Sequence, residues 1–258
     1  MPFWAAGLYA GKWNFSQGWC DVSATMLLTL GWASMLNVGL IALNRYVKVV
    51  KRALYSVLFP SKRVAWLYCG VVWLVSVLIA TPPLYGWGKL KFDSDSFLCI
   101  VNWKEGHFSF VIMISGVFNV ITCVIFYSYW KIYQKVKEST TKINANVAQN
   151  GVGAPRLDRT DIKLFKACFT VACLFLLTWG PPCIVGFTTA AGGYAPPDAH
   201  KVATYLLFSC SIVNPIIYGI VNPQFKEAFK KALCCGCHGS HNADQNQARI
   251  VEEVIRTF

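Results

Sequence analysis

Long uninterrupted apolar segments dominate the pattern of hydrophobic and polar positions along this chain. A helix rises ~1.5 Å per residue, so about 20 apolar residues cross the hydrocarbon core of a bilayer. Five segments of about that length contain no Lys, Arg, Asp, Glu or His, and we interpret them as transmembrane helices. They are Val22–Leu43, Val64–Leu84, Phe108–Tyr129, Ala167–Phe187 and Val202–Val221.

The first ten residues form a shorter apolar segment, which ends before Lys12. The segment lacks the basic start and the cleavage-like stretch of a signal peptide. Two interpretations remain open. It is an interfacial or re-entrant segment, or it is the last turns of a spanning helix whose beginning is missing from this chain.

The distribution of charge indicates which connections between the spans lie in the cytoplasm. Only 14% of residues are charged, too few to cover a soluble domain, and 24 Lys+Arg against 12 Asp+Glu leave a net charge of +12. The basic residues gather in the first and third connections between spans, whereas Gly86–His107 balances three lysines with three acids. The positive-inside rule places those basic connections and the C-terminal tail in the cytoplasm. The excess charge is therefore explained by topology, and we expect no nucleic-acid partner.

Cys20 and Cys99 are predicted to lie on the outer side, where disulfides persist. A disulfide between them would hold the long outer connection over the helical bundle, and two free thiols are the alternative. A third connection, Glu138–Arg159, is rich in Ser, Thr, Asn and Gln, with Pro155 near its end. It predicts a flexible cytoplasmic linker.

Three further cysteines, Cys234, Cys235 and Cys237, follow an amphipathic basic stretch on the cytoplasmic side. Cysteines in that position are candidates for palmitoylation. Unmodified thiols are one alternative, and a zinc site with His238 and His241 is another. The Cys-Cys-Gly-Cys spacing is tighter than the pairs of structural zinc sites, so acylation is favoured.

Three short motifs lie near the ends of the predicted spans. Asn44-Arg45-Tyr46 ends the first span, Asn214-Pro-Ile-Ile-Tyr218 ends the last, and Thr178-Trp-Gly-Pro181 lies within the fourth. A proline inside a spanning helix removes a backbone hydrogen bond and produces a kink. Two kinked helices beside a Trp and an Asn are suited to a switch in which helices swing.

In this order, the motifs resemble those of class A (rhodopsin-like) G protein-coupled receptors over nearly the whole chain. Asn44 to Tyr46 resembles the DRY motif, Asn214 to Tyr218 matches NPxxY, and Thr178 to Pro181 resembles CWxP, with Phe175 at the family's transmission position. Further matches are Trp13-Asn14-Phe15 before Cys20 with the WxFG motif, Trp73 with the marker Trp of helix four, and Phe225 with the start of helix eight.

The resemblance implies an all-α membrane protein, a bundle of transmembrane helices three to seven with the end of helix two and a short membrane-parallel helix eight. We expect the receptor domain over residues 1–237, a cytoplasmic tail over 238–258, and a multi-pass protein of the plasma membrane without a cofactor. Helix one and most of helix two are absent, so we expect a truncated sequence. Asn44 replaces the family's acid, Ile121 its helix-five proline and Thr178 its usual Cys.

The resemblance narrows the class of ligand mainly through ligand-binding residues of the family that this chain lacks. Leu27 stands where amine receptors have an Asp, and Phe208 where opsins have the retinal-binding Lys. Residues Pro82–Gly88 and the Asn44 variant resemble the melatonin–opsin neighbourhood. Pro83 and Val101, however, occupy the positions of the Asn and Gln with which melatonin receptors hold their ligand.

The expected pocket contains no charged side chain, so a cationic amine would enter it without a counter-ion, and burying an unpaired charge costs several kcal/mol. The predicted ligand is small, extracellular, neutral and largely apolar, with aromatic contacts to Trp179 and Phe208 and a hydrogen bond through Thr204. Lys201 leaves room for an acidic group at the rim. The expected lining residues are Leu27, Leu28, Gly31, Met113, Phe118, Trp179, Cys183, Thr204 and Phe208.

The expected intracellular partner is a heterotrimeric G protein. Arg45 is predicted to contact it and to be restrained at rest by Asp161, which lies about five turns below Trp179. A solvated Asp161 without that role is the alternative. The full set of expected switch residues is Asn44, Arg45, Tyr46, Tyr129, Asp161, Asn214, Pro215 and Tyr218.

Other classes of protein fit less well. A transporter would place ionisable residues within the spans, and an enzyme would need a nucleophile, base or metal cluster in a cleft. The spans hold no ionisable acid or base, and all four His residues lie outside them. Membrane lipid is also an expected partner, and other receptors are the partners under the remaining alternative. A truncated, non-signalling fragment would act only by associating with full-length relatives.

Overall fold

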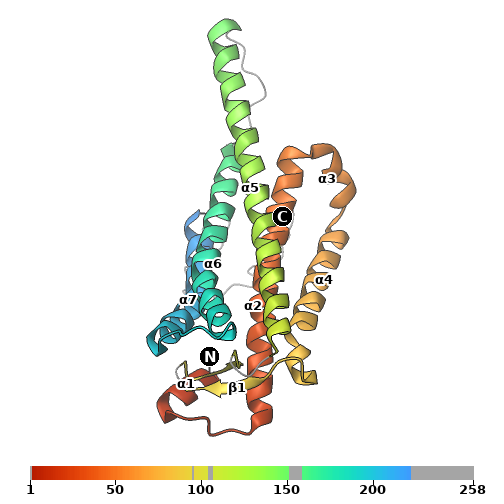
Figure 1. Cartoon of the computed structure of the whole chain (residues 1–258). Coiled ribbons are helices and arrows are strands. Elements are labelled where there is room, and N and C mark those ends of the chain that lie inside the picture. Colours follow the sequence, from red (N-terminus) through yellow and green to blue (C-terminus); the bar gives the residue numbers. More distant parts are fainter. Residues whose placement is uncertain (1, 95, 104–106, 151–158, 222–258) are drawn as a thin grey trace, which may run out of the picture. The chain divides into compact units, whose positions relative to one another are not determined.

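The computed structural model describes residues 2–94, 96–103, 107–150 and 159–221. Within these ranges, side chains are described except at positions 2, 4, 140, 142–150, 159–168 and 210–221. The elements, in chain order, are α1 (Pro2–Ala10), α2 (Gln17–Val50), α3 (Arg52–Leu58), α4 (Lys62–Ala80), the 3-10 helix η1 (Pro82–Tyr85), β1 (Leu90–Asp93), β2 (Leu98–Val101), α5 (Phe108–Asn150), α6 (Arg159–Ala190) and α7 (Pro197–Val221) (Figure 1).

The chain divides into two compact units. The first unit consists of Met1–Gly39, Leu67–Cys123 and Leu174–Cys210, and it contains α1, η1 and both strands. The second unit consists of Leu40–Trp66, Val124–Cys173 and Ser211–Phe258, and it contains α3. Helices α2, α4, α5, α6 and α7 contribute residues to both units, which are described separately below.

All five predicted spans are helical. Among the described residues, α2, α4, Phe108–Ser139 of α5 and Phe169–Ala190 of α6 are long and apolar enough to cross a membrane. The fifth span lies in α7. The predicted span Val64–Leu84 is too long, because α4 ends at Ala80 and Pro82 and Pro83 start η1. Proline lacks the N–H that would continue the helical ladder.

The predicted linker from Glu138 is wrong over its first half. Helix α5 continues to Asn150, and residues 151–158 lie outside the described part of the chain. The extension contains neither Gly nor Pro, and local contacts support it. Lys135 Nζ lies 3.3 Å from Glu138 Oε2, and Thr141 Oγ1 donates to the carbonyl of Lys137 at 3.0 Å. A polar composition therefore does not end the helix here.

The buried face of α4 is narrow and made of small side chains. Val72, Ser76 and Ala80 follow one another at intervals of four residues and are buried, and Ser76 Oγ donates to the carbonyl of Val72 at 2.7 Å. Large apolar residues such as Trp66 and Leu74 are 65% and 60% exposed. This arrangement is expected of a helix whose remaining surface faces lipid.

A β-hairpin, which the apolar pattern did not predict, lies across the N-terminal end of α2 beside α1 in the first unit (Figure 1). Strands β1 and β2 pair antiparallel, with Leu90 opposite Val101 and Phe92 opposite Cys99. Ser96 donates to Asp93 Oδ2 from its hydroxyl at 2.6 Å and from its backbone N–H at 3.2 Å, which closes the turn. A Cβ placed on Gly7 of α1 would lie 3.0 Å from the carbonyl oxygen of Phe97, so α1 packs closely on the hairpin.

Candidate functional site

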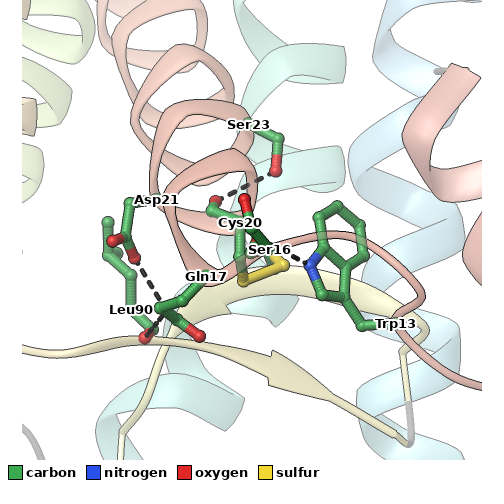
Figure 2. Close-up of a disulfide and its surroundings, with 8 residues drawn as sticks. Trp13, Ser16, Gln17, Cys20, Asp21, Ser23 and Leu90 are labelled. Carbon is green, nitrogen blue, oxygen red and sulfur yellow. Dashed lines mark hydrogen bonds between the residues drawn. A yellow bond between two sulfur atoms is a disulfide. The ribbon is translucent and has the colours of Figure 1, made fainter.

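A disulfide joins the start of α2 to the hairpin. Cys20 in α2 and Cys99 in β2 are bonded, with Cα atoms 5.3 Å apart, and both are buried (Figure 2). The bridge therefore confirms the predicted disulfide. It closes a loop of 79 residues, for which the chain-entropy estimate is about 4.5 kcal/mol. That figure is an upper value here, because membrane helices within the loop limit its freedom.

Polar contacts at the same end of α2 hold the hairpin in register with the helix. Gln17 Nε2 donates to Asp21 Oδ1 at 2.8 Å and to the carbonyl of Leu90 at 3.2 Å (Figure 2). Trp13 Nε1 donates to the carbonyl of Ser16 at 3.2 Å, where the first turn of α2 begins. The hairpin is thus fixed to α2 by the disulfide and by the hydrogen bond from Gln17 to Leu90.

The bridge lies in an apolar core within the first unit. The buried members of this core come from α2, both strands and the first turns of α5, and several aromatic side chains pack on it. The buried members are Cys20, Ala24, Leu90, Cys99, Val101, Phe110 and Ile114. Because strand residues alternate in direction, this anchoring also determines which hairpin side chains face the bundle.

A cavity of about 150 Å³ lies in the first unit. Seven of the nine predicted pocket residues line it: Leu27, Leu28, Gly31, Phe118, Trp179, Cys183 and Thr204. They come from α2, α5, α6 and α7, the four helices that the motifs indicated. The structure therefore brings these side chains together around one space, and their role in ligand binding stays a prediction.

Met113 and Phe208 are not among the lining residues. Met113 packs against the apolar core around the disulfide, whereas the next residue, Ile114, lines the cavity. On α7 the lining residues His200, Ala203, Thr204 and Leu207 form one helical face. Phe208 follows that face by one residue, about 100° around the helix axis.

The contribution of the hairpin to the cavity was not predicted from the sequence. Ser96, Leu98, Ile100, Val101 and Trp103 also line the cavity. The available signal was the position of Cys99, since residues next to a disulfide that holds a strand over the bundle must lie near the bundle. The other lining residues that were not predicted are Trp32, Met35, Ile114, Ser115, Pro182, Val185, Gly186, His200, Ala203 and Leu207.

The cavity is mainly apolar and offers few polar groups. None of the described lining residues is Asp, Glu, Lys or Arg. Thr204 Oγ1 donates to the carbonyl of His200 at 2.9 Å, so its oxygen can still accept. Lys201 does not line the cavity and lies 3.2 Å from Asp198 Oδ1, a carboxylate that is 90% exposed. That pairing makes Lys201 a weaker anchor for an acidic ligand group than predicted.

Trp179 is held between two neighbours in the first unit. Its ring stacks on Phe175 with centroids 5.5 Å apart and planes 16° apart. On α2, a Cβ placed on Gly31 would overlap the six-membered ring of Trp179, with distances of 3.0 and 3.2 Å to Cζ2 and Cζ3. Trp179 Nε1 is buried and has no hydrogen-bond partner within the described part of the chain. Gly31 is therefore needed to admit the indole.

The second unit holds the first group of predicted switch residues. Asn44 and Arg45 are buried, at 8% and 6% exposure, near the end of α2. The ring of Tyr46 lies 5.9 Å from that of Tyr127, and the buried Tyr129 makes an edge contact with Phe169 at 5.5 Å. α5 therefore contacts α2 and α6 through aromatic side chains in this unit.

The remaining predicted residues lie outside the described side chains. Asp161 belongs to α6, and Asn214, Pro215 and Tyr218 belong to α7, but only their backbone is described. The predicted lipidation residues Cys234, Cys235 and Cys237 and the predicted helix eight lie outside the described residues. Among the described residues, no group of three or more His, Cys, Asp or Glu is placed to hold a metal ion.

Comparison with known proteins agrees with this geometry. The family described as "7 transmembrane receptor (rhodopsin family)" matches residues 1–218. Similar proteins include G-protein coupled receptor 161 of Xenopus tropicalis, 28% identical over 95% of this chain and 51% of that protein. Melanopsin of Felis catus is 29% identical over 93% of this chain and 52% of that protein, and melatonin receptor type 1C of Xenopus laevis is 25% identical over 90% and 54%.

A solved structure of squid rhodopsin has the same fold, with a TM-score of 0.74 and 24% identity over 96% of this chain and 74% of that one. The chain spans about half the length of the curated relatives named above. The family model confirms the resemblance seen in the motifs, and its members are multi-pass proteins of the plasma membrane. The chain belongs to the rhodopsin family of seven-transmembrane receptors.

Proposed function

We propose that this chain is a signalling receptor that binds a small, neutral, largely apolar extracellular molecule in the cavity of the first unit and activates a heterotrimeric G protein. The observation that carries the proposal is the lining of the cavity. Four helices and the hairpin converge on it, and its described lining has no Asp, Glu, Lys or Arg.

Such a lining disfavours a cationic ligand. An ammonium group would leave water and find no carboxylate, which costs several kcal/mol. A penalty of about 3 kcal/mol lowers affinity by roughly a hundredfold. The proposed ligand is therefore uncharged at the end that enters the cavity.

Two polar atoms define where the ligand would form hydrogen bonds. The buried N–H of Trp179 has no partner among the described residues, and an unsatisfied buried donor costs about 1–3 kcal/mol. Because this atom is closed to solvent, a ligand acceptor, such as a carbonyl, ether or hydroxyl oxygen, would satisfy it when the ligand shifts the indole. The hydroxyl oxygen of Thr204 can accept a bond from a ligand donor, since its own proton is directed to His200.

The proposed route to the G protein follows the helices. α2 and α6 each contribute residues to both units, so a ligand that displaces Trp179 shifts a helix that continues into the second unit. Arg45 is proposed to contact the G protein, with Asn44, Tyr46 and Tyr129 around it and Asp161 restraining it. The burial of Arg45 supports a restrained resting state.

The test is ligand-dependent nucleotide exchange on purified G proteins by the chain in lipid nanodiscs. Neutral compounds are screened beside amines of the same carbon skeleton. We expect activation by neutral compounds, abolished in Arg45→Ala and retained in Arg63→Ala, an exposed arginine control. Potent activation by a small amine, undiminished by Trp179→Ala, would contradict the proposed ligand class. Correct insertion without exchange for any compound would favour the non-signalling fragment.

A further inference from the structure

Trp103 belongs to the first unit but to none of its helices, and its side chain reaches the cavity from the segment after the hairpin. It follows the end of β2 by two residues and Cys99 by four, packs partly buried against the core around the disulfide, and lines the cavity. Its backbone therefore belongs to the segment that the disulfide fixes to α2, while its side chain reaches the cavity between the helices.

Gly186 of α6 lies directly against the indole of Trp103. A Cβ placed on Gly186 would lie 2.9 Å from both Cε2 and Cζ2 and 3.1 Å from Cδ2 of the ring. Contacts below 3.0 Å between a Cβ and a rigid ring do not persist, so any side chain at 186 would displace the indole. A mid-helix glycine costs about 1 kcal/mol relative to alanine. The close approach of Trp103 explains why a glycine stands at this position.

The volume of the cavity limits what fits beside the indole. A dry cavity of about 150 Å³ accommodates a molecule of about the size of benzene, whereas sites for drug-sized ligands measure ~300–1,000 Å³. The cavity in this chain has a volume of about 150 Å³ with Trp103 against Gly186. A ligand with more than one ring must therefore displace part of the lining, and Trp103 is the large lining side chain that comes from outside the helices.

We propose that Trp103 closes the cavity on the side of the hairpin and sets the size of the ligand that it admits, with Gly186 as the surface on which its indole rests. The proposal rests on the proposed function, because it gives the size class and the entry control of the same ligand site. Single-ring compounds enter without displacing Trp103, and larger compounds bind only when the indole leaves Gly186.

Cys183 provides a reporter that needs no known ligand and no G protein. This cysteine lines the same cavity and is not in a disulfide. The chain in lipid nanodiscs is treated with N-methylmaleimide, which is small, or with fluorescein maleimide, which is bulky and reacts by the same addition. Peptide mass spectrometry then gives the rate for Cys183 separately from the rate for Cys69, a free cysteine of α4 outside the cavity lining.

If the indole lies away from Gly186 in a tenth of the molecules, deleting the indole raises the rate at which the bulky reagent modifies Cys183 about tenfold. We expect that rise at Cys183 in Trp103→Ala, a much smaller rise with N-methylmaleimide, and no change at Cys69. Gly186→Ala should reproduce the effect by displacing the ring, and it should add nothing in the Trp103→Ala background. Gly180→Ala is the matched control, because a Cβ there meets no atom within 4 Å.

An unchanged rate of Cys183 with the bulky reagent in both Trp103→Ala and Gly186→Ala would overturn the proposal. A variant in which Cys69 also accelerates has lost its fold. In that case Gly186→Ala decides, since it deletes no side chain that packs on the disulfide core. Failure of the proposed function would give another result. No compound would activate a G protein, but the rate at Cys183 would still depend on the size of the reagent.

Discussion

Gly31→Ala should destabilise the first unit through one contact with Trp179. The added methyl would overlap the six-membered ring of the indole, with Cζ2 and Cζ3 only 3.0 and 3.2 Å away. Overpacking of this kind lowers stability by about 1–3 kcal/mol, whereas replacing a mid-helix glycine with alanine raises stability by up to about 1 kcal/mol. We therefore expect a net loss of about 1–2 kcal/mol, which lowers Tm by about 2–8 °C for a chain of this size.

The assay is thermal unfolding of the chain in nanodiscs, with Trp179→Phe as the second mutation of a double-mutant cycle. Phenylalanine lacks the outer ring atoms that meet the methyl, so Gly31→Ala should become neutral or stabilising in that background. Gly116→Ala is the control, because a Cβ there meets nothing within 4 Å. An equal loss of Tm from Gly31→Ala with Trp or Phe at 179 would refute the steric reasoning.

Three further predictions follow from other parts of the chain. Cys99→Ser should remove about 2–5 kcal/mol of stability and lower Tm, whereas Cys69→Ser, at a free cysteine, should not; equal Tm values would show that the bridge is not stabilising. Asp161→Ala should raise basal nucleotide exchange by roughly fivefold, since an ion pair at a wet boundary contributes about 1 kcal/mol, and unchanged basal exchange would count against the restraint on Arg45. Asp198→Ala should leave ligand-dependent exchange unaltered, because its pair with Lys201 is exposed; a changed ligand preference would show that Lys201 contributes to the site.

The helices of this protein could be predicted because bilayer physics acts on each segment independently. A span needs about 20 residues without charge, and that condition is visible in Phe108–Tyr129 without knowledge of any neighbour. The end of a helix in water is a different problem. Polar residues after Glu138 are compatible with helix or coil, so the continuation of α5 to Asn150 could not be predicted from composition.

The pocket could be predicted where a motif fixes the helical phase. Trp179 and Cys183 are one turn apart, and the motif on α6 identifies their face. On α5, where no proline marks the phase, Phe118 was predicted correctly, but Met113 was predicted in place of its neighbour Ile114. An error of one residue turns a side chain by about 100°, away from the cavity.

The hairpin could not be predicted because its strands are short and its position depends on distant partners. β1 and β2 have four residues each, and the contact of Trp103 with Gly186 joins residues 83 positions apart. A Gly within an apolar helix has many explanations, and the approach of a ring from another segment is evident only in three dimensions.

The central claim is that the cavity of the first unit binds a neutral ligand and rejects a cation, and protection of Cys183 tests it most directly. Benzyl alcohol and benzylamine have the same ring and nearly the same size, and they differ in charge at neutral pH. The measurement is the rate at which N-methylmaleimide modifies Cys183, relative to Cys69, as each compound is added. Our account predicts saturable slowing by benzyl alcohol and none by benzylamine at the same concentrations. Equal or stronger protection by benzylamine, or none by either compound, would contradict it.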